Sequence, residues 1–323
     1  TAYMADQLPQ RGGVFIQAES EVAAINMLYG ASAAGARCMT SSSSPGISLK
    51  QEGISYLAGS ELPAVILNVQ RGGPGLGNIA PSQGDYFQAT RGGGHGDYRC
   101  IVLAPAGVQE FCDLTYLAFD LADRYRNPVI VLSDGMIGQM MEPVSFDHLP
   151  EPEPPPKPWA LTGQPDRARN VVKSFVAEAE DMAQFHRKFL ARHRRIAEEE
   201  VRFELAGPED AEVLLVAYGT SARICLQVVE RLARELPFSV ALFRPITLWP
   251  FPSPPLTNLA ERVRGIMVVE MSAGQLVEDV RLAVEGRCPV ELLSSLGGLL
   301  PEAGQVTKEL ISLFEESSQR GER

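Results

Sequence analysis

The sequence predicts an α/β protein in which two sheet-containing domains are joined by a linker. Three observations support this prediction: β-rich runs alternate with helical stretches over residues 1–149, a proline cluster interrupts them, and a second alternating set follows. With 323 residues, of which 45% are hydrophobic, the chain is long enough for two cores. We place the domains at residues 1–149 and 207–323, with residues 150–206 as the linker.

The first domain contains five candidate strands. They are GVFIQA (13–18), RCMTSS (37–42), AVILNVQR (64–71), YRCIVLAP (98–105) and PVIVLSDG (128–135). Apolar residues recur at helical spacing from Val108 to Tyr125, which predicts an amphipathic helix covering one face of a parallel sheet.

The segment LPEPEPPPKPW ends this pattern, because proline lacks an N–H and fixes φ. From Asp166 to Glu200 the chain is rich in helix formers, and apolar residues spaced for one face predict a long connecting helix. Those residues are Phe175, Met182, Phe185 and Phe189. After Gly207 a second α/β set is predicted, with strands AEVLLVAYG (211–219), SVALFRP (239–245), GIMVVEM (265–271) and PVELLSS (289–295).

Composition excludes several classes of function. The net charge of -11 disfavours nucleic acid as a partner, because binding of a phosphate backbone needs a cationic face. No apolar run is long enough to span a membrane. Five scattered cysteines without a C-x-x-C pair predict no metal cluster in this chain and fit a reducing cytoplasm.

Two acids stand at the start of a segment dense in alanine and glycine, where a predicted helix begins. The helix dipole favours an anion at Glu19 or Glu21. From the residues alone, a solvated first-turn glutamate is the default interpretation.

A strand-to-helix corner is predicted at the serine run that follows. Ser44 is placed as the N-cap and Pro45 at the first helical position, and capping alone explains both residues.

Two glycine runs, GGPGLGN and RGGGHG, lack the G-x-G-x-x-G pattern of a dinucleotide site. We expect them to let main chain pack closely around a cofactor or a neighbouring subunit. His95 stands among these glycines; a structural role is the default, and a proton relay is the alternative.

The sequence resembles the thiamine diphosphate enzymes, in which a helix-starting glutamate precedes a glycine by nine residues, as Glu21 precedes Gly30. The resemblance sharpens over MTSSSSPGISLKQEGISYLAGSELPAVILNVQRGGPGLGN, RGGGHGDYR, SDGMIGQMMEPV, VAYGTSARI, RPITLWPFP and VVEMSAGQLVEDVRLAV. These segments are similar to the alpha subunit of 2-oxoacid:ferredoxin oxidoreductases, especially the branched-chain type, over nearly the whole chain. The implied fold is a pyrimidine-type thiamine diphosphate domain followed by a transketolase C-terminal-like domain.

The resemblance also implies roles for individual residues. Glu21 would be catalytic, protonating N1′ of the aminopyrimidine, and would bind the cofactor together with Gly46. Arg71 would hold the substrate carboxylate by paired charge-assisted hydrogen bonds, with Arg91 as a weaker candidate. The serine corner approaches cofactor and substrate in related enzymes, which adds Ser43 and Ser44 as substrate-binding candidates.

One motif of thiamine enzymes is missing. The magnesium-binding G-D-G motif with its later asparagine does not occur; Ser133-Asp134-Gly135 is the nearest approximation, and Asn170 is too distant. The resemblance therefore places the diphosphate and Mg²⁺ on a beta subunit, with iron–sulfur clusters on further partners such as gamma and ferredoxin-like delta subunits. A family segment with a G-Y-P-I-T-P-like turn is also missing upstream of Thr1, which suggests a truncated chain.

The activity implied for the assembled enzyme is coenzyme A-dependent oxidative decarboxylation of a 2-oxoacid, giving acyl-CoA and CO₂ and passing electrons to ferredoxin. The substrate is expected to be 3-methyl-2-oxobutanoate, with 2-oxoglutarate and pyruvate as alternatives. Two rival readings are the beta subunit of a lipoyl-linked 2-oxoacid dehydrogenase and a non-catalytic scaffold.

Overall fold

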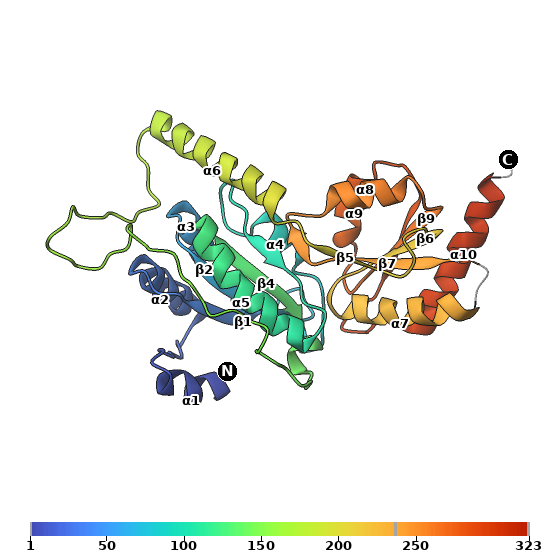
Figure 1. The fold of residues 1–323 in the computed structure, drawn as a ribbon, viewed down its shortest axis with the longest axis horizontal. Coiled ribbons are helices and arrows are strands. Elements are labelled where there is room, and N and C mark those ends of the chain that lie inside the picture. Colours follow the sequence, from blue (N-terminus) through green and yellow to red (C-terminus); the bar gives the residue numbers. More distant parts are fainter. Residues whose placement is uncertain (1, 236–237, 322–323) are drawn as a thin grey trace.

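A computed structural model describes residues 2–235 and 238–321 and has two α/β lobes (Figure 1). The first lobe contains α1 (Ala2–Gln10), α2 (Glu21–Ala33), β1 (Met39–Ser43), α3 (Ser44–Gly59), β2 (Ala64–Gln70), α4 (Tyr86–Arg91), β3 (Ile101–Leu103), α5 (Val108–Tyr125), β4 (Pro128–Asp134) and the 3-10 turn η1 (Ile137–Gln139). The remaining elements are α6 (Ala179–Glu199), β5 (Phe203–Ala206), β6 (Val213–Val216), α7 (Gly219–Glu235), β7 (Val240–Pro245), β8 (Thr247–Trp249), α8 (Ser253–Ala260), β9 (Gly265–Glu270), α9 (Leu276–Val284), β10 (Val290–Ser294) and α10 (Ala303–Gly321).

The first sheet has the strand order β1-β2-β4-β3-β8, and all neighbouring pairs are parallel except β3 with β8. Alternate residues of its central strands enter different cores. On β2, Val65 packs with α5 residues such as Leu114, whereas Ile66 packs with α2 and α3 residues such as Ile25 and Ile54. Strands buried on both faces read as continuous apolar runs, which explains why β2 and β4 were recognisable in the sequence.

The second sheet has the order β10-β9-β6-β7-β5, with only the β5–β7 pair antiparallel. Helices α7 and α10 contact one another and β9, while α8 and α9 pair on the opposite side (Figure 1). The predicted α/β class is therefore confirmed, with two sheets that are each parallel except for one edge pair. No helix in the described residues could cross a membrane.

Buried hydrogen bonds join the two lobes. Gln83 Nε2 donates to the carbonyl of Tyr218, and Gln83 Oε1 accepts from Ser221 Oγ. Asp134, at the end of β4, accepts from the backbone N–H and the hydroxyl of Thr220 at the start of α7. These bonds fix the carboxyl end of the first sheet against the second lobe.

The predicted strand at residues 13–18 is wrong. Val14 and Ile16 are 79% and 63% exposed, and the segment pairs with no described strand. A strand needs a hydrogen-bonding neighbour, and the adjacent edge strand β1 pairs only with β2.

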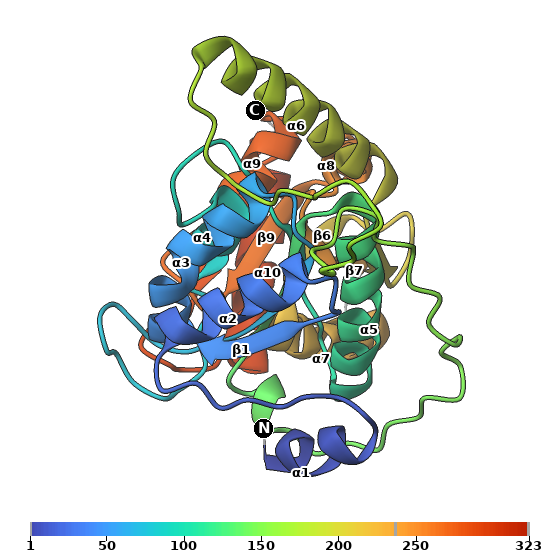
Figure 2. The same ribbon diagram turned by 90° about the vertical axis from the view of Figure 1, so that its left-hand side faces the viewer.

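The predicted helix from Asp166 to Glu200 is too long. Helix α6 begins at Ala179, and the preceding segment folds back as a loop in which Arg167 and Asn170 donate to the carbonyl of Pro158. Phe175 is therefore exposed, whereas Phe189 is buried on α6. Figure 2 shows the extended path of this linker beside the helices of the first lobe.

Two short antiparallel strands had not been predicted. Strand β5 closes one edge of the second sheet, and β8 joins the edge of the first sheet although it lies far along the chain. Strands of three or four residues carry little local signal, because their pairing is decided by distant partners.

Candidate active site

Glu21 is the first residue of α2. Ser20 caps this helix, since its hydroxyl accepts a hydrogen bond from the Ala23 N–H at 3.1 Å. Only the first turn of a helix has unpaired N–H groups, so a carboxylate there lies at the positive end of the helix dipole. Glu21 is half-buried, whereas Glu19 is exposed.

The Glu21 side chain lies against Gly46, in the first turn of α3. A Cβ atom built on Gly46 would stand 2.8 Å from both Cγ and Oε1 of Glu21, and it would also collide with Ser42 Oγ. Glycine is therefore the residue that fits, and its missing side chain lets the carboxylate reach the β1–α3 corner. The structure brings together Glu21 and Gly46, which lie far apart in the sequence.

The corner itself differs from the prediction by one position. The N-cap is Ser43, without a side-chain cap bond, and Ser44 is the first helical residue. Ser44 Oγ instead accepts from the Arg71 N–H at 3.0 Å and lies 3.3 Å from the Arg71 carbonyl, to which it donates. Tertiary bonds to the end of β2 replaced the local cap that the sequence suggested.

Arg71 directly follows β2, and its backbone is bonded to Ser44 at the start of α3. Its Nη2 donates to the Leu76 carbonyl at 3.2 Å, and its buried Nε has no hydrogen-bond partner among the described residues. No described carboxylate forms an ion pair with it. A guanidinium with an unused donor and no counter-charge is suited to bind an anion.

Arg91 is engaged elsewhere. Its two terminal nitrogens donate to the two carboxylate oxygens of Asp279 at 3.0 and 2.9 Å, and the Tyr86 hydroxyl donates to the same carboxylate at 2.6 Å. The hydrogen bond to Asp279 comes first among the causes that raise the pKa of Arg91. This pair connects α4 with α9 and gives Arg91 a structural partner.

The RGGGHG run packs on α3. A Cβ atom on Gly93 or Gly94 would stand only 2.5 or 2.6 Å from atoms of Gln51, so the run does permit close packing, here within the chain. His95 is exposed, and only its backbone carbonyl has a described bond, accepted from Ser55 Oγ.

Asp134 and Asn170 are the residues that the sequence offers nearest to the magnesium-binding motif of thiamine enzymes. Both side chains form hydrogen bonds within the chain. Asp134 Oδ1 accepts from the Met136 and Ile137 N–H groups in addition to Thr220, and Asn170 donates to loop carbonyls. Among the described residues no group of three acidic, histidine or cysteine side chains is arranged to hold a metal ion.

Sequence reasoning missed Lys50. It lies on α3, four residues after Gly46, and its side chain is almost fully buried. Burial lowers its pKa, and the Glu21 charge acts in the opposite direction. The signal in the sequence that could have identified Lys50 was its spacing from Gly46, because residues four apart share one face of a helix.

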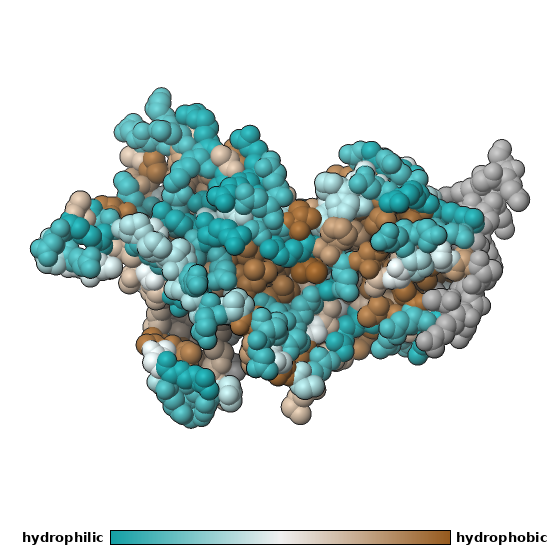
Figure 3. Space-filling model, in the orientation of Figure 1, coloured by the Kyte–Doolittle hydropathy of each residue, from teal (hydrophilic) through white to brown (hydrophobic). Residues whose placement is uncertain are grey.

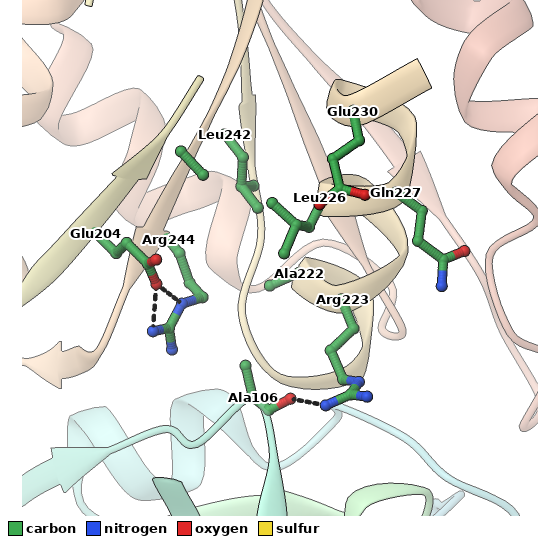
Figure 4. Close-up of a pocket in the computed structure, with 10 residues that line it drawn as sticks. Ala106, Glu204, Ala222, Arg223, Leu226, Gln227, Glu230, Leu242 and Arg244 are labelled. Atoms are coloured by element: carbon green, nitrogen blue, oxygen red, sulfur yellow. Dashed lines mark hydrogen bonds and ion pairs between the residues drawn. The ribbon is translucent and has the colours of Figure 1, made fainter. Parts of the chain in front are cut away.

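The cavity drawn in Figure 4 lies elsewhere, in the second lobe next to Ala106. Its two arginines are paired: Arg223 forms an ion pair with Glu142, and Arg244 binds Glu204 and Glu110. With its cations neutralised in this way, the cavity is a weaker candidate for an anionic substrate than the Glu21–Arg71 corner.

Comparison with known proteins identifies the family of this chain. Residues 1–199 match the family model described as pyruvate flavodoxin/ferredoxin oxidoreductase, thiamine diphosphate-binding, and residues 211–306 match pyruvate:ferredoxin oxidoreductase core domain II. The chain is 51% identical over 310 residues to ketoisovalerate oxidoreductase subunit VorB of Methanothermobacter thermautotrophicus, covering 96% of this chain and 88% of that protein. It is 39% identical to 2-oxoglutarate synthase subunit KorA of Archaeoglobus fulgidus, covering 93% and 86%.

Solved structures show the same architecture. A 2-oxoglutarate:ferredoxin oxidoreductase from Magnetococcus marinus, with 2-oxoglutarate, coenzyme A and succinyl-CoA bound, superposes with a TM-score of 0.83 at 26% identity, covering 97% of this chain and 59% of that one. A split-gene transketolase in an inactive beta4 tetramer shares the fold alone, with a TM-score of 0.59 at 13% identity, covering 98% and 87%.

Two helix-covered sheets with the matched domain models define the thiamine diphosphate-binding class of α/β enzymes. Within that class, the chain belongs to the 2-oxoacid:ferredoxin oxidoreductase family and is a subunit of such an oxidoreductase. The family resemblance, the fold class and the type of enzyme that the sequence predicted are confirmed, and the lipoyl-linked rival is disfavoured.

Proposed function

We propose that this chain supplies the pyrimidine-binding half of a thiamine diphosphate site that a partner subunit completes. The single observation behind this proposal is the Glu21 carboxylate, held at a helix start against Gly46. The residues fit the ring end of the cofactor: a carboxylate that can give or accept a proton at N1′, beside a backbone surface without a side chain. When bound, the cofactor supplies a nucleophilic carbon for attack on the 2-oxoacid carbonyl.

Arg71 is proposed to hold the substrate carboxylate, with Ser43 and Ser44 lining the same corner. The unused Nε donor and the lack of an acidic partner support this role. Ser44 adds rigidity, because its two bonds to the Arg71 backbone fix the point from which the guanidinium extends.

The diphosphate, Mg²⁺ and iron–sulfur clusters are proposed to lie on partner subunits: a beta subunit, with gamma and ferredoxin-like delta subunits, and ferredoxin as electron acceptor. An exposed apolar surface next to Arg71 supports a docked partner. Leu76 and Ile79, on the loop after β2, are largely exposed, and Asn78 joins this loop to Gly297, near the exposed Leu296 and Leu299. Figure 3 shows further apolar surface between the two lobes, on the face in view.

The substrate is proposed to be 3-methyl-2-oxobutanoate, which the ketoisovalerate relatives support; 2-oxoglutarate and pyruvate are the alternatives. Coenzyme A is the proposed acyl acceptor, as supported by the coenzyme A-bound structural neighbour. We also propose that the domains span residues 1–149 and 207–323, with residues 150–206 as the linker between them. The free cysteines support a cytoplasmic location.

The test is Glu21→Gln in the complex assembled from native partners. We expect coenzyme A-dependent reduction of a viologen dye, without lipoyl protein, to fall by about 10²–10⁴-fold, because an amide cannot exchange the N1′ proton. Glu19→Gln is the matched control, since Glu19 is exposed two residues earlier, and it should retain activity. A panel of 2-oxoacids in the same assay ranks the substrates.

Two results would contradict the proposal. Undiminished turnover of the Glu21→Gln complex would favour a scaffold role for this chain. Strict dependence of turnover on lipoyl protein would instead favour the hypothesis that this chain is the beta subunit of a lipoyl-linked 2-oxoacid dehydrogenase.

A further inference from the structure

Lys50 is the most deeply buried cation among the described residues, with 1% of its surface exposed. Its Nζ donates to Thr40 Oγ1 at 2.8 Å and to the Ser41 carbonyl at 3.1 Å, both on β1. Other buried cations have a carboxylate in direct contact, as Arg244 has Glu110 and Glu204. Lys50 has only neutral oxygens as hydrogen-bond partners.

Burying an ammonium group is costly unless a charge compensates for it. For Lys50 that charge is Glu21: burial lowers the pKa of the lysine, and the Glu21 carboxylate raises it. The strand beneath α3 contributes only the uncharged Thr40 and Ser41 to its immediate surroundings.

The geometry explains how Glu21 and Lys50 interact. Gly46 and Lys50 are one helical turn apart on the same face of α3, and the Glu21 carboxylate lies at Gly46. The absent side chain of Gly46 leaves the acid facing the turn from which Lys50 projects.

We propose that Lys50 is a positioning residue for Glu21, whose buried ammonium attracts the carboxylate and orients it at the site of the aminopyrimidine ring. This inference rests on the proposed function of Glu21. By attracting the carboxylate, Lys50 would hold it where it can exchange a proton with N1′ of a bound ring. A lysine that merely tied α3 to β1 would have no such effect.

The first experiment needs no cofactor. The chain contains few lysines, so isotope-labelled lysine in the full chain gives separable NMR signals, and loss of one signal in Lys50→Met assigns it. We expect the pKa of Lys50 to lie below the ordinary lysine value and to fall further in Glu21→Gln, because the compensating charge is lost. An unchanged Lys50 titration in Glu21→Gln would overturn the proposal.

The second experiment uses the assembled enzyme loaded with thiamine diphosphate. Lys50→Met should lower kcat by about tenfold, part of a general acid–base contribution of about 10²–10⁴, with KM for the 2-oxoacid unchanged. The circular dichroism of bound cofactor, which reports its ring tautomer, should shift in the same variant. Lys50→Arg retains the charge and should restore part of both signals.

Thr40→Val is the matched control, because it removes one Lys50 hydrogen bond but leaves the ammonium in place. If Lys50 only tied helix to strand, Thr40→Val and Lys50→Met would lose similar stability and neither would change the dichroism; that result would refute the proposal. Failure of every complex, including wild type, to bind thiamine diphosphate would instead refute the proposed function. The cofactor-free lysine titration distinguishes these cases, even if Lys50→Met does not assemble.

Discussion

At the scale of single residues, the candidate site depends on two side chains that flank one helix start. Glu21 lies at Gly46, and Ser44 in the same turn holds the backbone of Arg71. The acid is therefore placed for the cofactor ring and the guanidinium for an anion. Both sit near the carboxyl ends of β1 and β2, where open parallel sheets present their ligand sites.

Arg71→Gln should raise KM for the 2-oxoacid by about 10- to 100-fold, because a hydrogen bond to a charged group contributes about 1.5–3 kcal/mol. Steady-state kinetics of the assembled enzyme measures this. Arg91→Gln is the contrasting variant: its guanidinium is bound to Asp279, so KM should stay unchanged while stability falls. Equal KM values for wild type and Arg71→Gln would exclude Arg71 as the carboxylate anchor.

At the scale of elements, α6 is held to the first sheet by an aromatic contact that responds to pH. His193 is buried, with its ring centroid 4.3 Å from that of Phe189 and 5.4 Å from that of Trp249 on β8. Burial, followed by the nearby Arg192 and Arg99, lowers the pKa of His193 from 6.5 to about 4. The surroundings of His193 therefore favour the neutral ring in the folded chain.

The sign of the pH effect follows from proton binding. The unfolded chain protonates His193 near pH 6.5, whereas the folded chain does so only near 4, so folding stability falls as pH drops through that window. The contribution is roughly 3 kcal/mol at its full extent. His193→Phe should make urea-unfolding stability less dependent on pH between these values. A pH profile parallel to that of wild type would contradict this role.

At the scale of the whole molecule, a few polar contacts hold the lobes in register. Asp279 on α9 binds Arg91 and the buried Tyr86 hydroxyl of α4, while Gln83 and Asp134 bind the start of α7. These contacts fix α4, the loop around Gln83 and the end of β4 against the second lobe.

Asp279→Asn should destabilise the chain by about 2 kcal/mol, since it removes an ion pair that is partly exposed on the arginine side and weakens a buried acceptor. Equilibrium unfolding in urea measures the change. Glu278→Gln, on the exposed side of the same helix, should change stability by no more than about 0.5 kcal/mol. Similar losses in both variants would show that the contact between the lobes is not the cause.

Local patterns in the sequence were sufficient for most elements. The buried strands β2, β4, β7 and β9 fell within predicted apolar runs, and α5 matched its predicted limits, because burial on both sheet faces or one helix face leaves a periodic trace. Glu21 and Arg71 were also identified from the sequence, through the resemblance. The error at residues 13–18 shows the limit: an apolar run does not create its own pairing partner.

The amino-acid sequence alone determined the family, the α/β class and the identity of the candidate acid and guanidinium, since these depend on residue types and spacing along the chain. Only the tertiary structure decided that β8 joins the first sheet, that Ser44 bonds to Arg71, that Arg91 is held by Asp279, and that Lys50 is buried within reach of the Glu21 charge. Each of these depends on contacts between distant segments, which packing selects and local periodicity does not encode.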